Sequence, residues 1–125
     1  MQKGDFTAQD KDNISHLGER LSIKIMDSHC KDVGLPSMMV ESDNILVTNG
    51  VSGDSTPLLD ATRERAQHVL LPMWQRGQIP MVSGFFGSSV NGKLTTLGRG
   101  GTDLTAAVLG HSLDVDEINL FKVFE

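Results

Sequence analysis

The sequence predicts an α/β fold in which a mainly parallel sheet carries helices on both faces. Short apolar runs typical of strands alternate with long segments of helical periodicity. Long connections between successive strands favour parallel crossovers, which lay helices over the sheet. Glycine-rich loops follow two of the expected strands, at 84–87 and 98–102. Ligands of such sheets bind at the carboxyl ends of the strands, so these loops are the first place to look for a site.

Composition and charge narrow the possible classes of protein. The chain has 125 residues, 38% hydrophobic and 22% charged, which is typical of one globular domain. A net charge of −5 without a basic stripe argues against a nucleic-acid partner. No apolar run has membrane length and no signal-peptide pattern is present, so we expect no membrane partner. The single Cys30 fits a reducing compartment, and we expect the cytoplasm or an organelle lumen.

The elements follow from periodicity and from turn residues. Residues 1–13 are polar without periodicity and are expected to be a loosely held lead-in to a domain over 14–125. Apolar residues at helical spacing, Ile14, Leu17, Leu21 and Ile25, predict a first helix. A second stripe beside them, Ile23, Met26 and Cys30, gives it a broad apolar face that we expect to be covered on more than one side. The expected helices are 15–32, 57–76 and 103–113; the expected strands are 37–40, 44–48, 79–87 running into a loop, and 117–124, with a polar loop at 88–93.

One loop carries most of the chemical information. Gly98, Gly100 and Gly101 surround Arg99, and a helix-forming run follows at once. The free N–H groups at a helix start attract an anion, and an arginine fork matches a carboxylate or a phosphate. The pattern predicts an anion site, although a plain glycine-rich turn with an exposed arginine is equally compatible with these residues alone.

Other candidate groups have simpler interpretations. The four histidines show no metal-ligand spacing with Cys30 or with carboxylates, so no metal site is predicted. Glu19 fits a carboxylate favoured in the first turn of a helix. Asp103 fits the same description at the third helix, or it orients a basic group that handles phosphate.

Three segments together resemble the aspartate kinases of the amino-acid kinase superfamily. Residues 95–106, Thr-Thr-Leu-Gly-Arg-Gly-Gly-Thr-Asp-Leu-Thr-Ala, resemble the signature Thr-Thr-Leu-Gly-Arg-Gly-Gly-Ser-Asp-x-Thr-Ala, with Thr102 in place of serine. Residues 14–22 are similar to the family's Ser-x-Gly-Glu-x-Leu-Ser segment. Residues 81–87 are similar to its Val-Thr-Gly-Phe-Phe-Gly strand end.

The resemblance implies a fold, a reaction and a set of site residues. The fold would be an incomplete three-layer αβα sandwich of the carbamate-kinase type, and the parent protein a homo-oligomer. The reaction would be ATP- and Mg²⁺-dependent phosphorylation of the L-aspartate side chain to 4-phospho-L-aspartate, at the start of lysine, threonine and methionine synthesis. Arg99 and Thr102 would bind a substrate carboxylate, and Glu19 the ammonium group. Phe85 would wall the pocket and Asp103 would hold a catalytic lysine, on a loop backbone made by Gly84, Gly98, Gly100 and Gly101.

The sequence also departs from that family. The family's N-terminal Lys-Phe-Gly-Gly-Thr-Ser strand and its adenine-side segment have no counterpart in these residues. We therefore expect the central part of a catalytic domain that carries the aspartate-binding half of the site. Two alternatives remain open: an inactive fragment that binds an amino acid or a partner, and a kinase for another amino acid such as glutamate.

Overall fold

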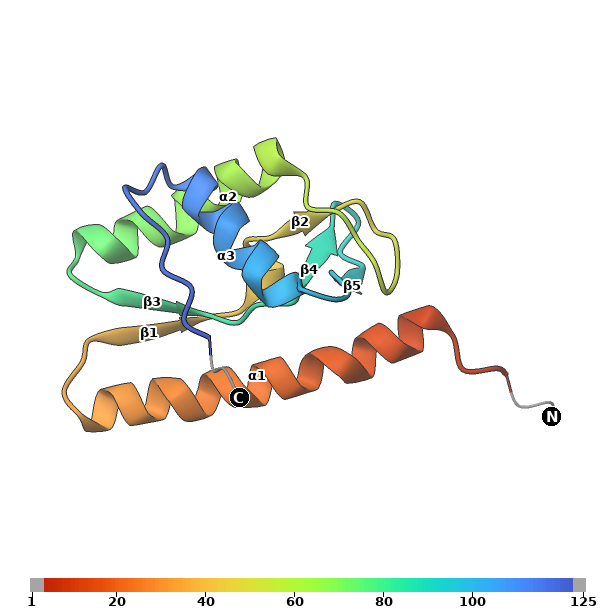
Figure 1. Cartoon of the computed structure of the whole chain (residues 1–125), viewed down its shortest axis with the longest axis horizontal. Coiled ribbons are helices and arrows are strands. Elements are labelled where there is room, and N and C mark those ends of the chain that lie inside the picture. The colour runs from red at the N-terminus through yellow and green to blue at the C-terminus, as the bar shows by residue number, and fades with distance from the viewer. Residues whose placement is uncertain (1–3, 123–125) are drawn as a thin grey trace.

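The strands lie between one long helix on one face and two helices on the other (Figure 1). The computed structural model describes residues 4–122. This layering agrees with the predicted α/β fold, because helices cover both faces of the strands. In chain order the elements are α1 (Ala8–Asp32), β1 (Ser37–Val40), the 3₁₀ turn η1 (Ser42–Asn44), β2 (Val47–Thr48), α2 (Leu59–Gln75), β3 (Ile79–Val82), β4 (Phe86–Ser89), β5 (Leu94–Thr96) and α3 (Gly101–Ser112).

The strands pair in two small groups. β1 pairs with β3 in parallel, from Ser37 opposite Ile79 to Val40 opposite Val82. β2 pairs with β4 in parallel, and β4 pairs with β5 in the antiparallel sense. The parallel pairs follow the predicted crossovers. They bring the carboxyl ends of β1 and β3 to the same edge.

The β4–β5 hairpin corrects the sequence analysis, which expected one strand over 79–87 and a loop over 88–93. A bend at 83–85 separates β3 from β4, and β4 continues to Ser89. The backbone amide of Ser89 donates to the carbonyl of Lys93 at 2.9 Å, and Gly92 takes a positive φ of 83° in the turn. The sequence did not predict β4 beyond residue 87, because its serines are small and polar and such residues have low β-propensity.

Helix α1 begins earlier than predicted, at Ala8 instead of Ser15. Thr7 caps it: its hydroxyl accepts from the Asp10 amide, and the Asp10 carboxylate accepts from the Thr7 amide. This reciprocal capping box satisfies two donors that a helix start would otherwise leave free. Residues 8–13 of the expected lead-in are therefore helical, despite lacking apolar periodicity.

The face by which α1 meets the strands is only partly the predicted one. The apolar stripe Ile14, Leu17, Leu21 and Ile25 is 54–63% exposed. The buried positions are Ile23 and Cys30 of the second stripe, together with Asp12, His16 and Asp27. Three of these five side chains are polar or charged, so hydrogen bonds define much of the contact between α1 and the strands.

The apolar core lies on the other side of the strands. One buried cluster joins β1 to α2 through Val40, Ile45, Ala66 and Leu70. A second cluster, Leu46, Leu97 and Val108, anchors α3 next to β5. Burial of such side chains contributes roughly 1.5–3 kcal/mol each. The second cluster fixes the start of α3 relative to the loop that precedes it.

Helices α2 and α3 each start two residues away from the predicted position. Pro57 forms a bridge with Thr48 and the Leu58 amide donates to Val47 at 2.7 Å, so α2 starts at Leu59 instead of residue 57. Helix α3 starts at Gly101, two residues before the predicted position.

The strand expected over 117–124 is absent from 117–122, and 123–125 lie outside the described residues. Ile118 packs against Gly110 instead, where a Cβ would lie 2.3 Å from Ile118 Cδ1.

Candidate anion-binding site

Two loops that follow strands meet at the start of α3. The first, 83–85, leaves β3, and the second, 97–100, leaves β5. They are in close contact: a Cβ at Gly84 would lie 3.2 Å from Thr102 Cγ2, and one at Gly101 would lie 3.1 Å from Phe85 Cδ1. Only glycine permits both approaches without a shift of the neighbouring atoms. The two glycine-rich segments found in the sequence are therefore parts of one structure.

Phe85 has a strained backbone at the centre of this contact. Its φ is +82°, a value that non-glycine residues rarely adopt. Its amide donates to Thr105 Oγ1 at 3.1 Å, and its carbonyl accepts from the Leu97 amide at 2.8 Å. Hydrogen bonds on both sides thus hold the conformation. Strain of this kind costs about 1–3 kcal/mol and gathers at functional sites.

The start of α3 has no side-chain cap. Its N-cap residue, Gly100, has φ of +78° and no side chain to accept from the first-turn amides. The Gly101 amide donates to the Gly98 carbonyl at 3.2 Å, which closes the loop tightly. The positive end of the helix dipole therefore faces this loop and favours a negative group there.

A hollow of about 320 Å³ opens beside the loop. Its walls come from α1, from the segment before α2, and from both loops. They are formed by Lys11, Asp12, Ser15, Gly53, Phe85, Thr96, Gly98 and Arg99. Arg99 is exposed and has no ion pair among residues 4–122, and the same holds for Lys11. Two cations in the wall, and a loop that runs into the uncapped start of α3, make the hollow suitable for an anionic ligand.

A larger hollow, of about 590 Å³, lies between α2 and β2. It includes Glu64, Arg65 and His68, but no part of either glycine-rich loop. We place the candidate site at the smaller hollow because the strained Phe85, the uncapped helix and two free cations meet there.

The structure brings some of the predicted site residues together. Phe85, Gly98 and Arg99 line the hollow. Gly84, Gly100, Gly101 and Thr102 adjoin it in the two loops and the first turn of α3, where Thr102 is exposed.

Two other predicted residues lie apart from the hollow. Glu19 is half-buried on α1, four residues after Ser15 and so on the same helix face, but it does not line the hollow. The Asp103 carboxylate forms an ion pair with Lys122. The resemblance implied that Asp103 holds a lysine, and Lys122 is the lysine it contacts here.

Sequence reasoning missed the part of the site that α1 contributes. Lys11, Asp12 and Ser15 line the hollow, yet the first two were assigned to a lead-in. A signal was available in the spacing of Asp12, Ser15 and Glu19, since positions three and four residues apart share a helix face. The capping pattern Thr7-x-x-Asp10 would have revealed that the helix begins early enough to carry them.

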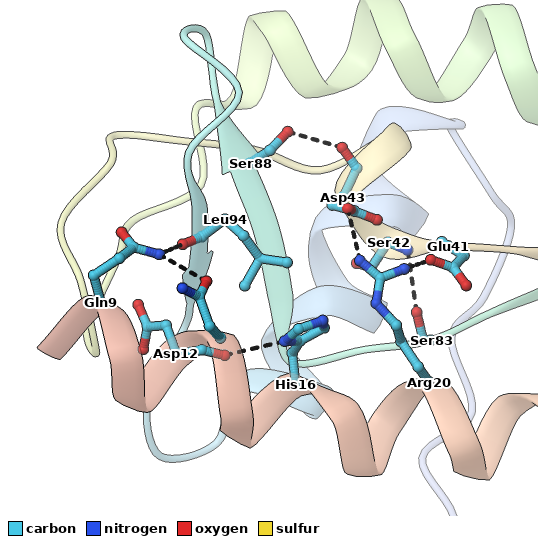
Figure 2. A network of polar contacts seen from close by, with 11 residues as sticks. Gln9, Asp12, His16, Arg20, Glu41, Ser42, Asp43, Ser83, Ser88 and Leu94 are labelled. Atoms are coloured by element: carbon cyan, nitrogen blue, oxygen red, sulfur yellow. Dashed lines mark hydrogen bonds and ion pairs between the residues drawn. The ribbon is translucent and has the colours of Figure 1, made fainter. Parts of the chain in front are cut away.

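Arg20, on the same helix as Asp12 and Ser15, is occupied by contacts with residues that follow β1 (Figure 2). Its guanidinium forms ion pairs with Glu41 and Asp43, which follow β1, and lies 4.9 Å from the centre of the Phe86 ring. The His16 ring packs edge-on against the same phenyl ring, with centroids 5.1 Å apart. Because two carboxylates already neutralise Arg20, we assign it to holding α1 against the strand ends and not to ligand binding.

Metal clusters and membrane spans are both absent from the described part of the chain. Between residues 4 and 122, no three His, Cys, Asp or Glu side chains meet in a group that could hold a metal ion. Over the same span, the helices are too short or too polar to cross a membrane.

Comparison with known proteins identifies the family. The family model described as the amino acid kinase family matches residues 2–123. The chain belongs to the amino acid kinase family. Among relatives, Aspartokinase 1, chloroplastic, of Arabidopsis thaliana is 30% identical over 120 residues, covering 94% of this chain and 21% of that protein. Lysine-sensitive aspartokinase 3 of Escherichia coli strain K12 is 32% identical over 108 residues, covering 86% of this chain and 24% of the relative.

Solved structures extend the similarity to three dimensions. E. coli aspartokinase III in complex with aspartate and ADP superposes with a TM-score of 0.82 at 30% sequence identity, covering 86% of this chain and 24% of that one. The amino acid kinase fold expected from the sequence is thereby confirmed, as is the resemblance to aspartate kinases. The chain spans only about a fifth to a quarter of the length of these relatives.

Proposed function

We propose that this chain carries the aspartate-binding part of an aspartate kinase. The observation that supports this most is the hollow lined by Arg99 and Phe85, beside the loop that leads into the uncapped start of α3, in a fold similar to an aspartokinase solved in complex with aspartate. The reaction would be transfer of a phosphoryl group from ATP to the L-aspartate side-chain carboxylate, giving 4-phospho-L-aspartate.

In this proposal each site residue has a role in holding the substrate. Arg99 binds a substrate carboxylate through two parallel N–H···O bonds, and the Thr102 hydroxyl donates to the same group. Glu19 accepts hydrogen bonds from the substrate ammonium. Phe85 forms the wall against which the short carbon chain packs. A fixed dicarboxylate would present one oxygen to the phosphoryl donor, and positioning of this kind accounts for most of the catalysis in phosphoryl transfer.

ATP and Mg²⁺ belong to the proposed reaction, and we assign none of the described residues to them. Residues 4–122 contain no cluster of acidic side chains able to bind a metal ion. Lys122, which follows α3 in the chain, pairs with Asp103 in the first turn of that helix. We therefore assign no step to the nucleotide or the metal here. Homo-oligomerisation of the parent protein and a cytoplasmic or organellar location are likewise proposals.

Isothermal titration of the chain with L-aspartate and L-glutamate tests this function. We expect L-aspartate to bind, L-glutamate to bind more weakly, and Arg99→Ala to bind L-aspartate roughly 30-fold more weakly than wild type. Arg76→Ala is the matched control, because Arg76 is an exposed arginine at the end of α2, away from the hollow. Absence of L-aspartate binding, or equal loss in both variants, would refute the proposal.

A second candidate is an amino-acid-binding module without turnover. It is supported by the lining of the hollow, because Arg99 can bind an amino-acid carboxylate without a phosphoryl donor. We expect the 125 residues to bind L-aspartate without releasing ADP from ATP. Aspartate-dependent ADP release by the purified chain would exclude this candidate and support a complete kinase site.

A further inference from the structure

Asp12 is a buried carboxylate that the proposed reaction does not use. It is only 1% exposed. Its Oδ1 accepts a 2.7 Å hydrogen bond from the Thr96 hydroxyl, and its Oδ2 accepts a 2.9 Å bond from the Gly53 amide. One side chain on α1 thus joins the end of β5 to the segment that precedes α2.

The two partners of Asp12 lead directly to the loop that carries Arg99. Thr96 is the last residue of β5, and its carbonyl accepts from both the amide and the hydroxyl of Ser55, at 3.0 and 2.9 Å. The 53–55 segment is therefore fastened to β5 at several points. It also packs against the turn beyond: a Cβ at Gly98 would lie 3.0 Å from the Gly53 carbonyl oxygen.

The environment of Asp12 is unusual for a carboxylate. Among the described residues, no lysine or arginine forms an ion pair with it. Neutral donors alone satisfy its oxygens, and burial of a carboxylate under these conditions is costly compared with burial of an apolar group. An apolar side chain could pack α1 against the strands, but it would leave the Thr96 hydroxyl and the Gly53 amide without this acceptor. The carboxylate fixes the orientation of the two segments relative to each other, because it accepts a directional hydrogen bond from a donor on each of them.

We propose that Asp12 is a positioning residue that fixes the 96–101 loop and so holds Arg99 over the hollow. Asp12 acts through Thr96 and Gly53 and does not itself contact the ligand. The proposal rests on the proposed function only for the choice of L-aspartate as the probe. The claim that Asp12 fixes the loop concerns the chain without ligand and does not depend on the proposed function.

The test compares two buried carboxylates on the same helix. Asp27 is also buried on α1, where it accepts from Ser37 Oγ at 2.7 Å, but it lies away from the hollow. Asp12→Ala and Asp27→Ala should both lower thermal stability. Only Asp12→Ala should accelerate amide hydrogen exchange at Gly53, Gly98 and Gly101, measured by NMR without ligand. It should also weaken L-aspartate binding by about tenfold, while Asp27→Ala leaves the affinity within about threefold of wild type.

Two more variants keep the proposal testable if Asp12→Ala does not fold. Thr96→Val removes one donor with little change of volume and should reproduce the faster exchange. Asp12→Asn keeps the shape: its oxygen accepts from Gly53, and its amide can donate to the Thr96 hydroxyl. It should therefore restore exchange and affinity to nearly wild-type values.

The outcomes separate this proposal from the proposed function. Equal exchange changes in Asp12→Ala and Asp27→Ala would show a merely structural role and overturn it. Asp12→Asn behaving like Asp12→Ala would overturn it as well, because charge and not geometry would then be required. If the wild-type chain did not bind L-aspartate, the proposed function would fail, and the exchange data would still decide whether Asp12 positions the loop.

Discussion

The Leu97 amide donates a 2.8 Å hydrogen bond to the carbonyl of Phe85, and this contact joins the two loops of the candidate site. It fixes a residue with φ of +82° against the segment that leads to Arg99. At the start of α3, Gly101 packs closely against both Leu97 and Phe85. The site therefore depends on backbone geometry as much as on its charged side chains, and several predictions test the two separately.

Arg99→Ala should reduce L-aspartate affinity by about 2 kcal/mol, roughly 30-fold, because a charge-assisted bidentate contact is lost. Its thermal stability should stay close to that of wild type, since Arg99 is exposed and makes no ion pair among the described residues. Calorimetric titration beside a thermal melt measures both quantities. A large fall in melting temperature would instead assign Arg99 a structural role.

Glu19→Gln should also weaken L-aspartate binding, because the amide removes the negative charge proposed to face the substrate ammonium while keeping the size of the side chain. We expect a loss of about 1–2 kcal/mol. Glu64→Gln, on α2 beside the other hollow, should leave binding unchanged. An unaffected Glu19 variant would support the simpler interpretation of Glu19 as a helix-surface carboxylate.

Gly101→Ala should destabilise the chain by about 1–3 kcal/mol, the usual cost of overpacking. The new methyl would lie 2.9 Å from Leu97 Cβ and 3.1 Å from Phe85 Cδ1. Gly18→Ala is the control, because a methyl group added there, on α1, would meet no atom within 4 Å. It should stabilise the helix by about 0.5–1 kcal/mol. Urea denaturation of the two variants should therefore give shifts of opposite sign.

The two faces of α1 should respond differently to truncation. Ile23→Ala should cost about 2–4 kcal/mol, because Ile23 is buried at 8% exposure. Leu21→Ala should change the free energy of unfolding by less than about 0.5 kcal/mol, because Leu21 is exposed. Equal losses in a denaturation experiment on the chain would mean that another surface covers the apolar stripe in solution.

The Asp27 carboxylate should make stability depend on pH. Its hydrogen bond with Lys31, and then that with Ser37, lower the pKa of Asp27 from the ordinary value of 3.8. A lowered pKa in the folded state stabilises the fold above pH 3.8, and this contribution is lost as pH falls through the folded-state pKa. The difference in urea midpoint between wild type and Asp27→Asn should accordingly shrink towards low pH.

Lys31→Met supplies the second arm of that experiment. It removes the main cause of the lowered pKa of Asp27 and leaves Ser37 in place. When both chains carry Lys31→Met, the effect of Asp27→Asn on the urea midpoint should therefore depend less on pH, but the dependence should not disappear. Parallel curves for wild type and Asp27→Asn across the whole range would show that Asp27 has the same pKa in the folded and unfolded chain.

Local patterns were enough to predict most of the elements but not the surfaces that they bury. Helices α2 and α3 lie within two residues of their predicted starts, because capping and turn residues act over a few positions. The buried face of α1 could not be predicted in this way. Its apolar stripe is exposed, while Asp12 and Asp27 are buried by hydrogen bonds to residues far along the chain. The hairpin at 86–96 was missed because its serines are satisfied by tertiary contacts, such as Ser88 with the Asp43 carbonyl.

The sequence by itself determined the family and the α/β layering, and it predicted an anion site at the 98–101 loop, because these inferences depend on residue types at short spacing. Only the tertiary structure decided what surrounds that loop. It brought Lys11, Asp12 and Ser15 from a supposed lead-in to the wall of the hollow, and it paired Asp103 with Lys122. The physical reason is that buried polar groups must find partners, and their partners lie wherever the packed chain brings a donor within hydrogen-bonding distance.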